Sequence, residues 1–343
     1  MITIDGSKGE GGGQVVRSSL ALSLMTGTPV TIDNVRAGRK KPGLLRQHTT
    51  AVHAAAEISD ARIEGAEIGS KRFVFEPGEV KAGEYRFSVG SAGSTTLVFQ
   101  TVLPALMLIE SVSTVEVHGG THNPFAPPFD FLANAYLPLL RKLGPVVEAG
   151  ECQPGFYPMG GGSFRARISG RQPLQPLALA ERGKLVRRQV RALVANLPKH
   201  IGERECKLIA RKTGWDAKSF SYEEVKGSPG PGNVVMIELE FEQVTELFIA
   251  FGEVGKKAER VANEVLKAAQ KYLAMDVPVG SYLADQLLLP MGIAASQGQP
   301  CEYRTGPLTQ HTRTHIDVLK RFLDVSIDVA QDGDTRTVRL RQN

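Results

Sequence analysis

Two histidines near the carboxyl-terminal end of the chain have side chains that could act as metal ligands or as nucleophiles. His311 and His315 are four positions apart, which would place them one turn apart on the same face of a helix. A shared metal is one interpretation, but no glutamate stands between them as in the HExxH motif, so this signal is weak. As a nucleophile, His311 would need a phosphate electrophile held by cationic groups. Both histidines could also be polar residues at a helix start.

A glycine-rich segment near the amino terminus carries the second candidate group. Gly9-Glu10-Gly11-Gly12-Gly13-Gln14 precedes Arg17, and no Gly-Lys-Ser/Thr follows, so the segment is not a Walker A loop. Glycine-rich backbone that leads into a helix offers N–H groups and a positive dipole end to an anion. A tight turn explains the glycines alone more simply. The carboxylate of Glu10 is harder to explain by packing, and it could hold a divalent cation beside a nucleotide.

A basic segment, from Arg36 to His48, contains five positive charges and no acid. Most charge runs are solvated surface, but the glycines and the proline within this one indicate a defined loop, and loops commonly carry sites. Arginine side chains suit phosphate oxygens. With Arg17 nearby in the chain, we favour a phosphate or polyanion site. A further segment, Ser281 to Gln286, is on composition only a helix start with an acidic first turn.

Three stretches of the chain share an order of elements that would position these residues. After Gly11, Gly90 and Gly280, the periodicity predicts helix, strand, helix, strand and strand, which suggests three repeated α/β units. The expected helices are 14–25, 44–58, 93–109, 129–143, 280–295 and 310–322, and the expected strands lie at 30–32, near 63, at 73–75, at 114–117, near 146, 164 and 301–303, and at 325–329 and 337–340.

Residues 182–274 do not follow this order. They predict a strand near 185–194, a helix near 199–213, two strands flanking the turn Gly227 to Asn233, a strand at 247–251 and a long helix to about residue 273. We therefore divide the chain into a large domain, residues 1–181 and 275–343, and an inserted small α/β domain, residues 182–274.

The composition indicates an ordinary globular protein in a reducing compartment. The net charge of +5 is too small to indicate nucleic acid by itself. The three cysteines form no CxxC pair, which argues against a disulfide scaffold or a structural zinc site. The amino terminus lacks the pattern of a signal peptide. The longest apolar stretch, Leu97 to Ile109, is too short to span a bilayer. We expect a cytoplasmic protein without membrane contact.

Segments along the whole chain closely resemble the RNA 3′-terminal phosphate cyclase family. They occur in the family's order, which makes the resemblance specific. The matching segments are Asp5-Gly6 with Gly9 to Arg17, Arg36 to Arg39 through Gln47-His48, Gly90 to Gly93 through Gln100, Asn123 to Pro128, Gly155 to Pro158 with Gly160 to Gly162, Gly230 to Asn233, Tyr282 to Gln286, and His311 with Thr314 through Phe322.

The resemblance implies an ATP-dependent enzyme of the ligase class that converts an RNA 3′-phosphate to a 2′,3′-cyclic phosphate with a divalent cation, Mg²⁺ or Mn²⁺. In this family a histidine attacks the α-phosphate of ATP, releases pyrophosphate and carries AMP as a phosphoramidate. AMP passes to the RNA 3′-phosphate, and the vicinal 2′-hydroxyl displaces it. AMP thus supplies the leaving group that a phosphate monoester lacks, while arginines and the metal neutralise charge. The expected partners are ATP and RNA, and an oligomer is compatible with the sequence.

The resemblance also assigns site residues by position. His311 matches the nucleophile, and Glu10 matches a metal-contacting glutamate. Other active-site positions are Arg17, Arg36, Arg39 and Gln47, and the nucleotide-binding positions are Gln100, Tyr282, Leu283, Ala284, Asp285 and Gln286. His315 stands where the family's pattern has asparagine, so whether it assists His311 is left open. The implied fold, three βαβαββ-type units with an inserted small α/β domain, agrees with the order of elements above.

Three other classes of protein remain as alternatives. One is a cyclase-like RNA-binding factor in ribosome assembly, but such relatives lack the nucleophilic histidine that is present here. Another is an enolpyruvyl transferase, which has similar repeated units but needs no covalent histidine. The third is a general phosphate-binding protein.

Overall fold

The computed structural model describes residues 1–343 as a mixed α/β protein with four four-stranded sheets. A single hydrophobic cluster joins buried residues from all four sheets. The mixed α/β class predicted from the sequence is thereby confirmed. No helix combines the length and the apolar character that crossing a bilayer requires.

Three of the sheets share one strand order and one pattern of strand directions. In each, the first two strands are parallel and the other pairs are antiparallel. The first sheet is β1 (Ile2–Asp5), β2 (Val30–Asp33), β4 (Phe73–Glu76) and β3 (Arg62–Glu64); the second is β5 (Glu84–Ser88), β6 (Ser113–Gly119), β8 (Gly162–Ile168) and β7 (Val147–Gln153); the third is β9 (Leu177–Leu179), β14 (Cys301–Thr305), β16 (Thr335–Gln342) and β15 (Val325–Asp332).

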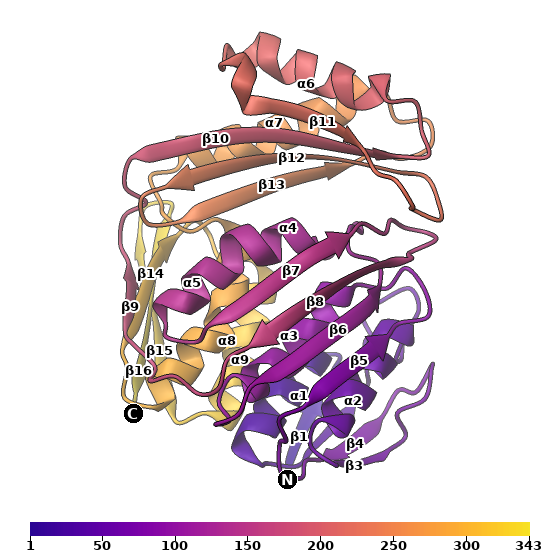
Figure 1. The fold of residues 1–343 in the computed structure, drawn as a ribbon. Coiled ribbons are helices and arrows are strands. Elements are labelled where there is room, and N and C mark those ends of the chain that lie inside the picture. Colours follow the sequence, from indigo (N-terminus) through magenta and orange to yellow (C-terminus); the bar gives the residue numbers. More distant parts are fainter.

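Helices pack between these three sheets and gather near the centre of the molecule (Figure 1). They are α1 (Gly13–Thr26), α2 (Arg46–Glu57), α3 (Thr95–Leu106), α8 (Ser281–Ser296) and α9 (Gln310–Phe322). Helix α1 packs against α2, α3 and α9, and α8 packs against α9. Helices α3 and α8 are buried on almost every face, as expected of helices that are apolar all round. The shared packing brings elements distant in sequence to one place.

The fourth sheet lies at one end of the molecule and has a different strand order (Figure 1). It consists of β11 (Phe220–Glu224), β10 (Leu185–Ala195), β12 (Gly232–Phe241) and β13 (Thr245–Phe251), with α6 (His200–Thr213) and α7 (Ala258–Ala274) on one face. Polar contacts join it to the rest: Arg191 pairs with Asp130, and the Asn134 side chain donates to Glu238 at 2.7 Å. These elements follow β9 and precede α8 in the chain. The division into repeated units and an inserted domain stays a prediction.

The predicted helices and strands are found close to their expected bounds, with two differences. The helix expected at 129–143 is broken into α4 (Phe129–Phe131), a π-helical turn (Leu132–Tyr136) and α5 (Leu137–Lys142). Pro138 lies at the start of α5, where it has no N–H to donate to the preceding turn. The short first strands β1, β5 and β9 were missed. Each is at most five residues long and pairs with a strand distant in sequence.

Glu246 on β13 connects the fourth sheet to α8. Its side chain is buried, and its Oε1 atom accepts a hydrogen bond from the backbone N–H of Gly280, which precedes the first residue of α8, at 2.6 Å. Burial raises the pKa of this carboxyl to about 8. The buried group is therefore protonated at neutral pH, and its amide analogue should occupy the same place.

We expect Glu246→Gln to change how stability depends on pH. The stability that Glu246 contributes is fully present below its ordinary pKa of 4.5 and is lost as pH rises through about 8. The variant should nearly match the wild type at pH 5 and exceed it at pH 8.5 by about 4 kcal/mol, because each pKa unit corresponds to about 1.4 kcal/mol. Urea denaturation at both pH values measures this. An equal difference at the two pH values would show that the carboxyl does not titrate as described.

Candidate active site

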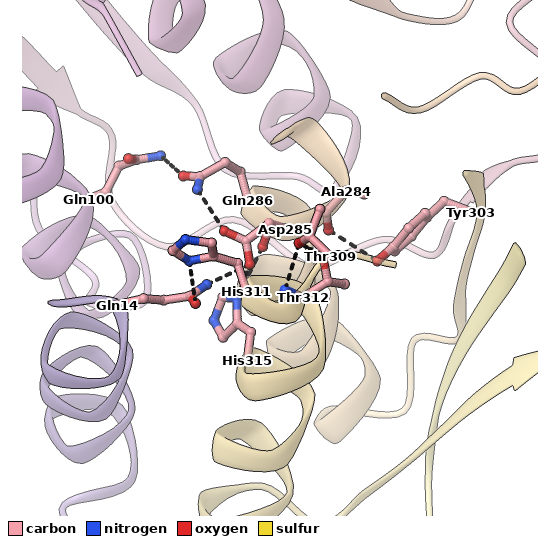
Figure 2. Close-up of polar contacts among 10 residues, drawn as sticks. All are labelled: Gln14, Gln100, Ala284, Asp285, Gln286, Tyr303, Thr309, His311, Thr312 and His315. Atoms are coloured by element: carbon pink, nitrogen blue, oxygen red, sulfur yellow. Dashed lines mark hydrogen bonds and ion pairs between the residues drawn. The ribbon is translucent and has the colours of Figure 1, made fainter. Parts of the chain in front are cut away.

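Side chains from the starts of α1 and α9 and from the body of α8 come together at His311 (Figure 2). His311 is the second residue of α9, Gln14 is the second residue of α1, and Asp285 and Gln286 lie in α8. Asp285 belongs to the second turn of α8, so the expectation of an acidic first turn there was wrong. Helix starts provide free N–H groups and positive dipole ends, which favour anions. The arrangement suits a phosphate-bearing ligand.

Gln14 links His311 to Asp285 by two hydrogen bonds. Its Nε2 atom donates to Asp285 Oδ1 at 2.5 Å, and its Oε1 atom lies 3.1 Å from His311 Nδ1. An ionised carboxylate can only accept, so the amide nitrogen of Gln14 must face Asp285 and its oxygen must face the histidine. That oxygen can also only accept, so Nδ1 carries the imidazole proton. His311 Nε2 is then left with a free lone pair.

His311 is accessible and neutral, as a nucleophile must be. Its side chain is 51% exposed, and Nε2 lies 3.4 Å from Glu10 Oε1. Partial burial lowers the pKa of the imidazole below its ordinary value; Asp285 opposes the change, and Arg39 and Arg17 add to it. The neutral form therefore predominates at pH 7.

His315, in contrast, is buried and faces Asp285. Its side chain is 6% exposed, and Nδ1 lies 3.1 Å from the backbone oxygen of Asp285 and 3.3 Å from its Oδ1. As a donor to these oxygens, His315 positions the same carboxylate that orients Gln14. Hydrogen bonds from His315 and Gln14 help to hold the pKa of Asp285 below its usual value against the effect of burial. The two histidines therefore occupy different environments, which does not favour a shared metal.

Glu10 is held in place by contacts between its loop and α9. Its backbone N–H donates to Thr314 Oγ1 at 2.9 Å. Gly9, just before it, has φ +66°, and a Cβ there would collide with the Thr314 hydroxyl, so only glycine fits. One carboxylate oxygen of Glu10 faces Arg39 and His311, whereas the other is buried without a partner. An unpaired buried carboxylate oxygen fits a divalent cation, although no group of three or more acidic, histidine or cysteine side chains gathers there.

Arg17 lines a cavity of about 50 Å³ without a carboxylate partner. Burial lowers the pKa of its guanidinium to about 10, which leaves it cationic. His48 is beside it: the His48 Nδ1 atom accepts from Leu45 N–H at 3.1 Å, so its Nε2–H points toward Gly13 at the start of α1. Burial and the nearby Arg17 lower the pKa of His48 to about 3. The cavity is lined by Gln14, Arg17, Ser18, Leu97, Gln100, Tyr136, Gln286, Leu289 and His315.

Other predicted site residues support the site or lie at its edges. Gln100 Nε2 donates to Gln286 Oε1 at 2.8 Å, which joins α3 to α8, as Figure 2 shows. Gln47 accepts from Ser94 N–H at 3.0 Å and joins α2 to α3. Tyr282 is 78% exposed at the start of α8. Leu283 and Ala284 are buried in the core, where the backbone oxygen of Ala284 accepts a hydrogen bond from the Tyr303 hydroxyl at 3.0 Å.

Arg36 is turned toward its own loop. Its Nη1 donates to the backbone oxygens of Lys41 and Gly43, at 2.8 and 2.7 Å. Arg36 is buried, and its backbone φ angle is +54°. Arg36 therefore shapes the basic loop from inside, and a direct role for it at the phosphate stays a prediction.

Gln14, His48 and Thr314 were not singled out as site residues from the sequence. Gln14 and His48 lie inside the glycine-rich and basic segments, which is the one local signal for them. The partner of Gln14, Asp285, is 271 positions away, and that of Glu10, Thr314, is 304 positions away. No local pattern reveals such pairs.

The fold and the site together define an enzyme-like centre: a neutral histidine, a buried carboxylate with one unpaired oxygen and an unpaired guanidinium around helix starts. Comparison with known proteins gives the class a name. The family model for RNA 3′-terminal phosphate cyclase matches residues 8–329. A protein described as RNA 3′-terminal phosphate cyclase in Koribacter versatilis (strain Ellin345) is 46% identical over 340 residues, covering 99% of this chain and 95% of the relative. The chain belongs to the RNA 3′-terminal phosphate cyclase family, and it is an enzyme of that family.

Proposed function

We propose that this chain uses ATP to convert the 3′-phosphate of an RNA to a 2′,3′-cyclic phosphate, with His311 as the covalent carrier of AMP. Family membership supports the reaction. The observation that carries the assignment of the nucleophile is the hydrogen-bonded chain from Asp285 through Gln14 to His311 Nδ1. It leaves the Nε2 lone pair free for attack.

The first step is attack of His311 Nε2 on the α-phosphorus of ATP. The N–P bond forms as the bond to the pyrophosphate oxygen breaks, and pyrophosphate leaves. The imidazole gains positive charge, which Gln14 and Asp285 stabilise through Nδ1–H. Arg17 stabilises the negative charge on the phosphate oxygens.

In the second and third steps AMP is transferred and displaced. An oxygen of the RNA 3′-phosphate attacks the phosphorus of the phosphoramidate, and His311 leaves as neutral imidazole. The 2′-hydroxyl oxygen then attacks the 3′-phosphorus and its proton passes to solvent; the bond to the AMP oxygen breaks, AMP leaves and the ring closes. We assign the binding of the incoming phosphate to Arg39, which is ion-paired with Glu10.

A divalent cation, Mg²⁺ or Mn²⁺, belongs to this proposal. The unpaired Oε2 atom of Glu10 would hold it, with the phosphate oxygens of ATP as further ligands. When bound, the cation would neutralise charge on those oxygens.

We also propose a division of the chain into domains and a cellular compartment. The common strand order of three sheets supports three repeated units in a large domain, residues 1–181 and 275–343. The place of the fourth sheet between β9 and α8 supports an insertion at residues 182–274. A reducing compartment such as the cytoplasm is proposed because Cys152, Cys206 and Cys301 are free thiols.

Gln14→Ala tests the role assigned to the hydrogen-bonded chain. Without Gln14, His311 can adopt either tautomer, and the proton can occupy Nε2. We expect the rate of AMP transfer to His311 at saturating ATP to fall at least ~10²-fold, since a wrong tautomer costs Ser-His-Asp enzymes up to about 10⁴-fold. Single-turnover kinetics measures this rate. The double variant Gln14→Ala/Asp285→Ala should lose little more rate than Gln14→Ala alone, because both residues act through one chain. An unchanged rate in Gln14→Ala would remove this chain from the mechanism.

A further inference from the structure

Phe125 presents an apolar ring to solvent in an uncommon backbone conformation. It lies in the segment Asn123 to Pro128, its φ is +67°, and its side chain is fully exposed, at 105%. A bulky residue rarely adopts positive φ, and such conformations persist where the surroundings impose them, commonly at ligand-binding sites. Neither the exposure nor the conformation serves the packing of the core. We therefore treat Phe125 as a residue that a ligand covers.

Two more exposed apolar side chains lie on a neighbouring segment. Tyr157 is 66% exposed and Met159 is 57% exposed. Their segment is bound to the one that carries Phe125, because the backbone oxygen of Gly155 accepts from both Thr121 N–H and His122 N–H, at 3.0 and 3.1 Å. We call Phe125 and Tyr157 the aromatic platform. Its two rings are carried by two segments that are hydrogen-bonded to each other.

The aromatic platform borders the start of α3, next to the active site. Thr96 Oγ1, in the first turn of α3, donates to the backbone oxygen of Pro127 at 2.6 Å, and Asn123 donates to the Ala92 carbonyl. Further along the same helix, Gln100 bonds to Gln286 in the active site. The platform therefore lies within one short helix of the reacting groups.

The other side of this helix start carries the positive charge. Ser94 N–H donates to Gln47, which follows Arg46 at the end of the basic loop. Lys40, Lys41 and Arg46 are all exposed. The segment that follows the exposed Arg46 and the segment that carries Phe125 are thus both hydrogen-bonded to the start of α3. Cations beside aromatic rings are the arrangement by which proteins bind single-stranded nucleic acid, with the backbone on the charges and the bases on the rings.

We propose that Phe125 and Tyr157 stack the bases of single-stranded RNA upstream of the reacting 3′-phosphate, while Lys40, Lys41 and Arg46 contact its backbone. This inference rests on the proposed function for the identity of the nucleic acid. Stacking tolerates every base, because each has an aromatic face, so the site would take RNA ends of varied sequence. A protein partner is disfavoured, since the apolar group is small, lies on separate loops and adjoins unpaired cations.

Binding of a 3′-phosphorylated oligoribonucleotide to Phe125→Ala and Tyr157→Ala tests the platform. Each substitution should weaken binding about fivefold or more, measured by fluorescence anisotropy. Binding of a mononucleoside 3′-phosphate should stay unchanged, because it has no upstream base. Phe125→Tyr should retain affinity. Val254→Ala is the matched control, since Val254 is equally exposed, at 107%, but lies in the turn before α7.

An oligonucleotide without bases at its last positions before the reacting nucleotide separates stacking from a change in protein structure. It should bind the wild type about fivefold or more weakly, and it should bind Phe125→Ala and the wild type alike, because the lost base and the lost ring are one interaction. Two results would overturn the proposal. One is that removing the bases weakens binding equally in the wild type and in Phe125→Ala, and the other is that neither alanine substitution changes the affinity for the complete oligoribonucleotide. The binding assay needs no catalysis, so a failure to transfer AMP to His311 would contradict the proposed function and leave this test intact.

Discussion

His311→Ala is expected to reduce the rate of RNA 3′-phosphate cyclisation by at least ~10³-fold, because no other exposed imidazole is placed to accept AMP. His315 cannot replace it, since that ring is buried against Asp285. Formation of the cyclic phosphate end, followed with a labelled RNA, measures the rate. The thermal stability of the variant should stay near that of the wild type, because the His311 side chain is half-exposed.

His315→Asn is the matched control for that experiment. An asparagine amide can donate to the Asp285 backbone oxygen as His315 Nδ1–H does, and asparagine is the residue expected at this position from the family's pattern. We expect activity within about tenfold of the wild type, since a positioning contact is retained. If His315→Asn were inactive and His311→Ala active, the roles assigned to the two histidines would be reversed.

Arg17→Ala should produce the second largest effect. Arg17 is a cation without a carboxylate partner beside the helix start where phosphates are expected. Loss of one preorganised group that stabilises charge in a transition state typically costs ~10²- to 10³-fold in rate. We expect that loss in AMP transfer from ATP to His311. Arg17→Lys should recover part of the rate, because the charge is kept and the planar guanidinium is lost.

A control for Arg17→Ala is Arg260→Ala, since Arg260 is an exposed arginine on α7, which packs on the fourth sheet, and it pairs with Glu264. It should leave the rate unchanged. Equal rates for Arg17→Ala and the wild type would show that the Arg17 guanidinium does not contact the transferring phosphate.

The helices and most strands were predictable because their signals are local. The amphipathic spacing in 310–322 matches α9 at both ends, and the glycine run marks the start of α1. The strands β1, β5 and β9 could not be found in this way. Each is short, and parallel pairing with a distant strand, as between Leu177 and Cys301, fixes its place in the sheet.

The site was predictable as a set of segments but not as a set of contacts. Arginines in a basic loop look alike in sequence, yet Arg39 faces Glu10 whereas Arg36 donates to the carbonyls of its own loop. The family resemblance marked Asp285 as a nucleotide-binding residue. The structure adds that Asp285 holds Gln14 and thereby sets the proton on His311. That chain depends on packing between α1, α8 and α9, which no single segment encodes.

Covalent labelling shows directly whether His311 carries AMP. The purified chain is incubated with ATP labelled at the α-phosphate and with Mg²⁺ or Mn²⁺, without RNA, and the protein is then denatured. We expect one AMP bound through an acid-labile, alkali-stable bond to His311, present in wild type and His315→Asn and absent in His311→Ala. Absence of label from the wild type, or undiminished label in His311→Ala, would show that His311 does not carry AMP.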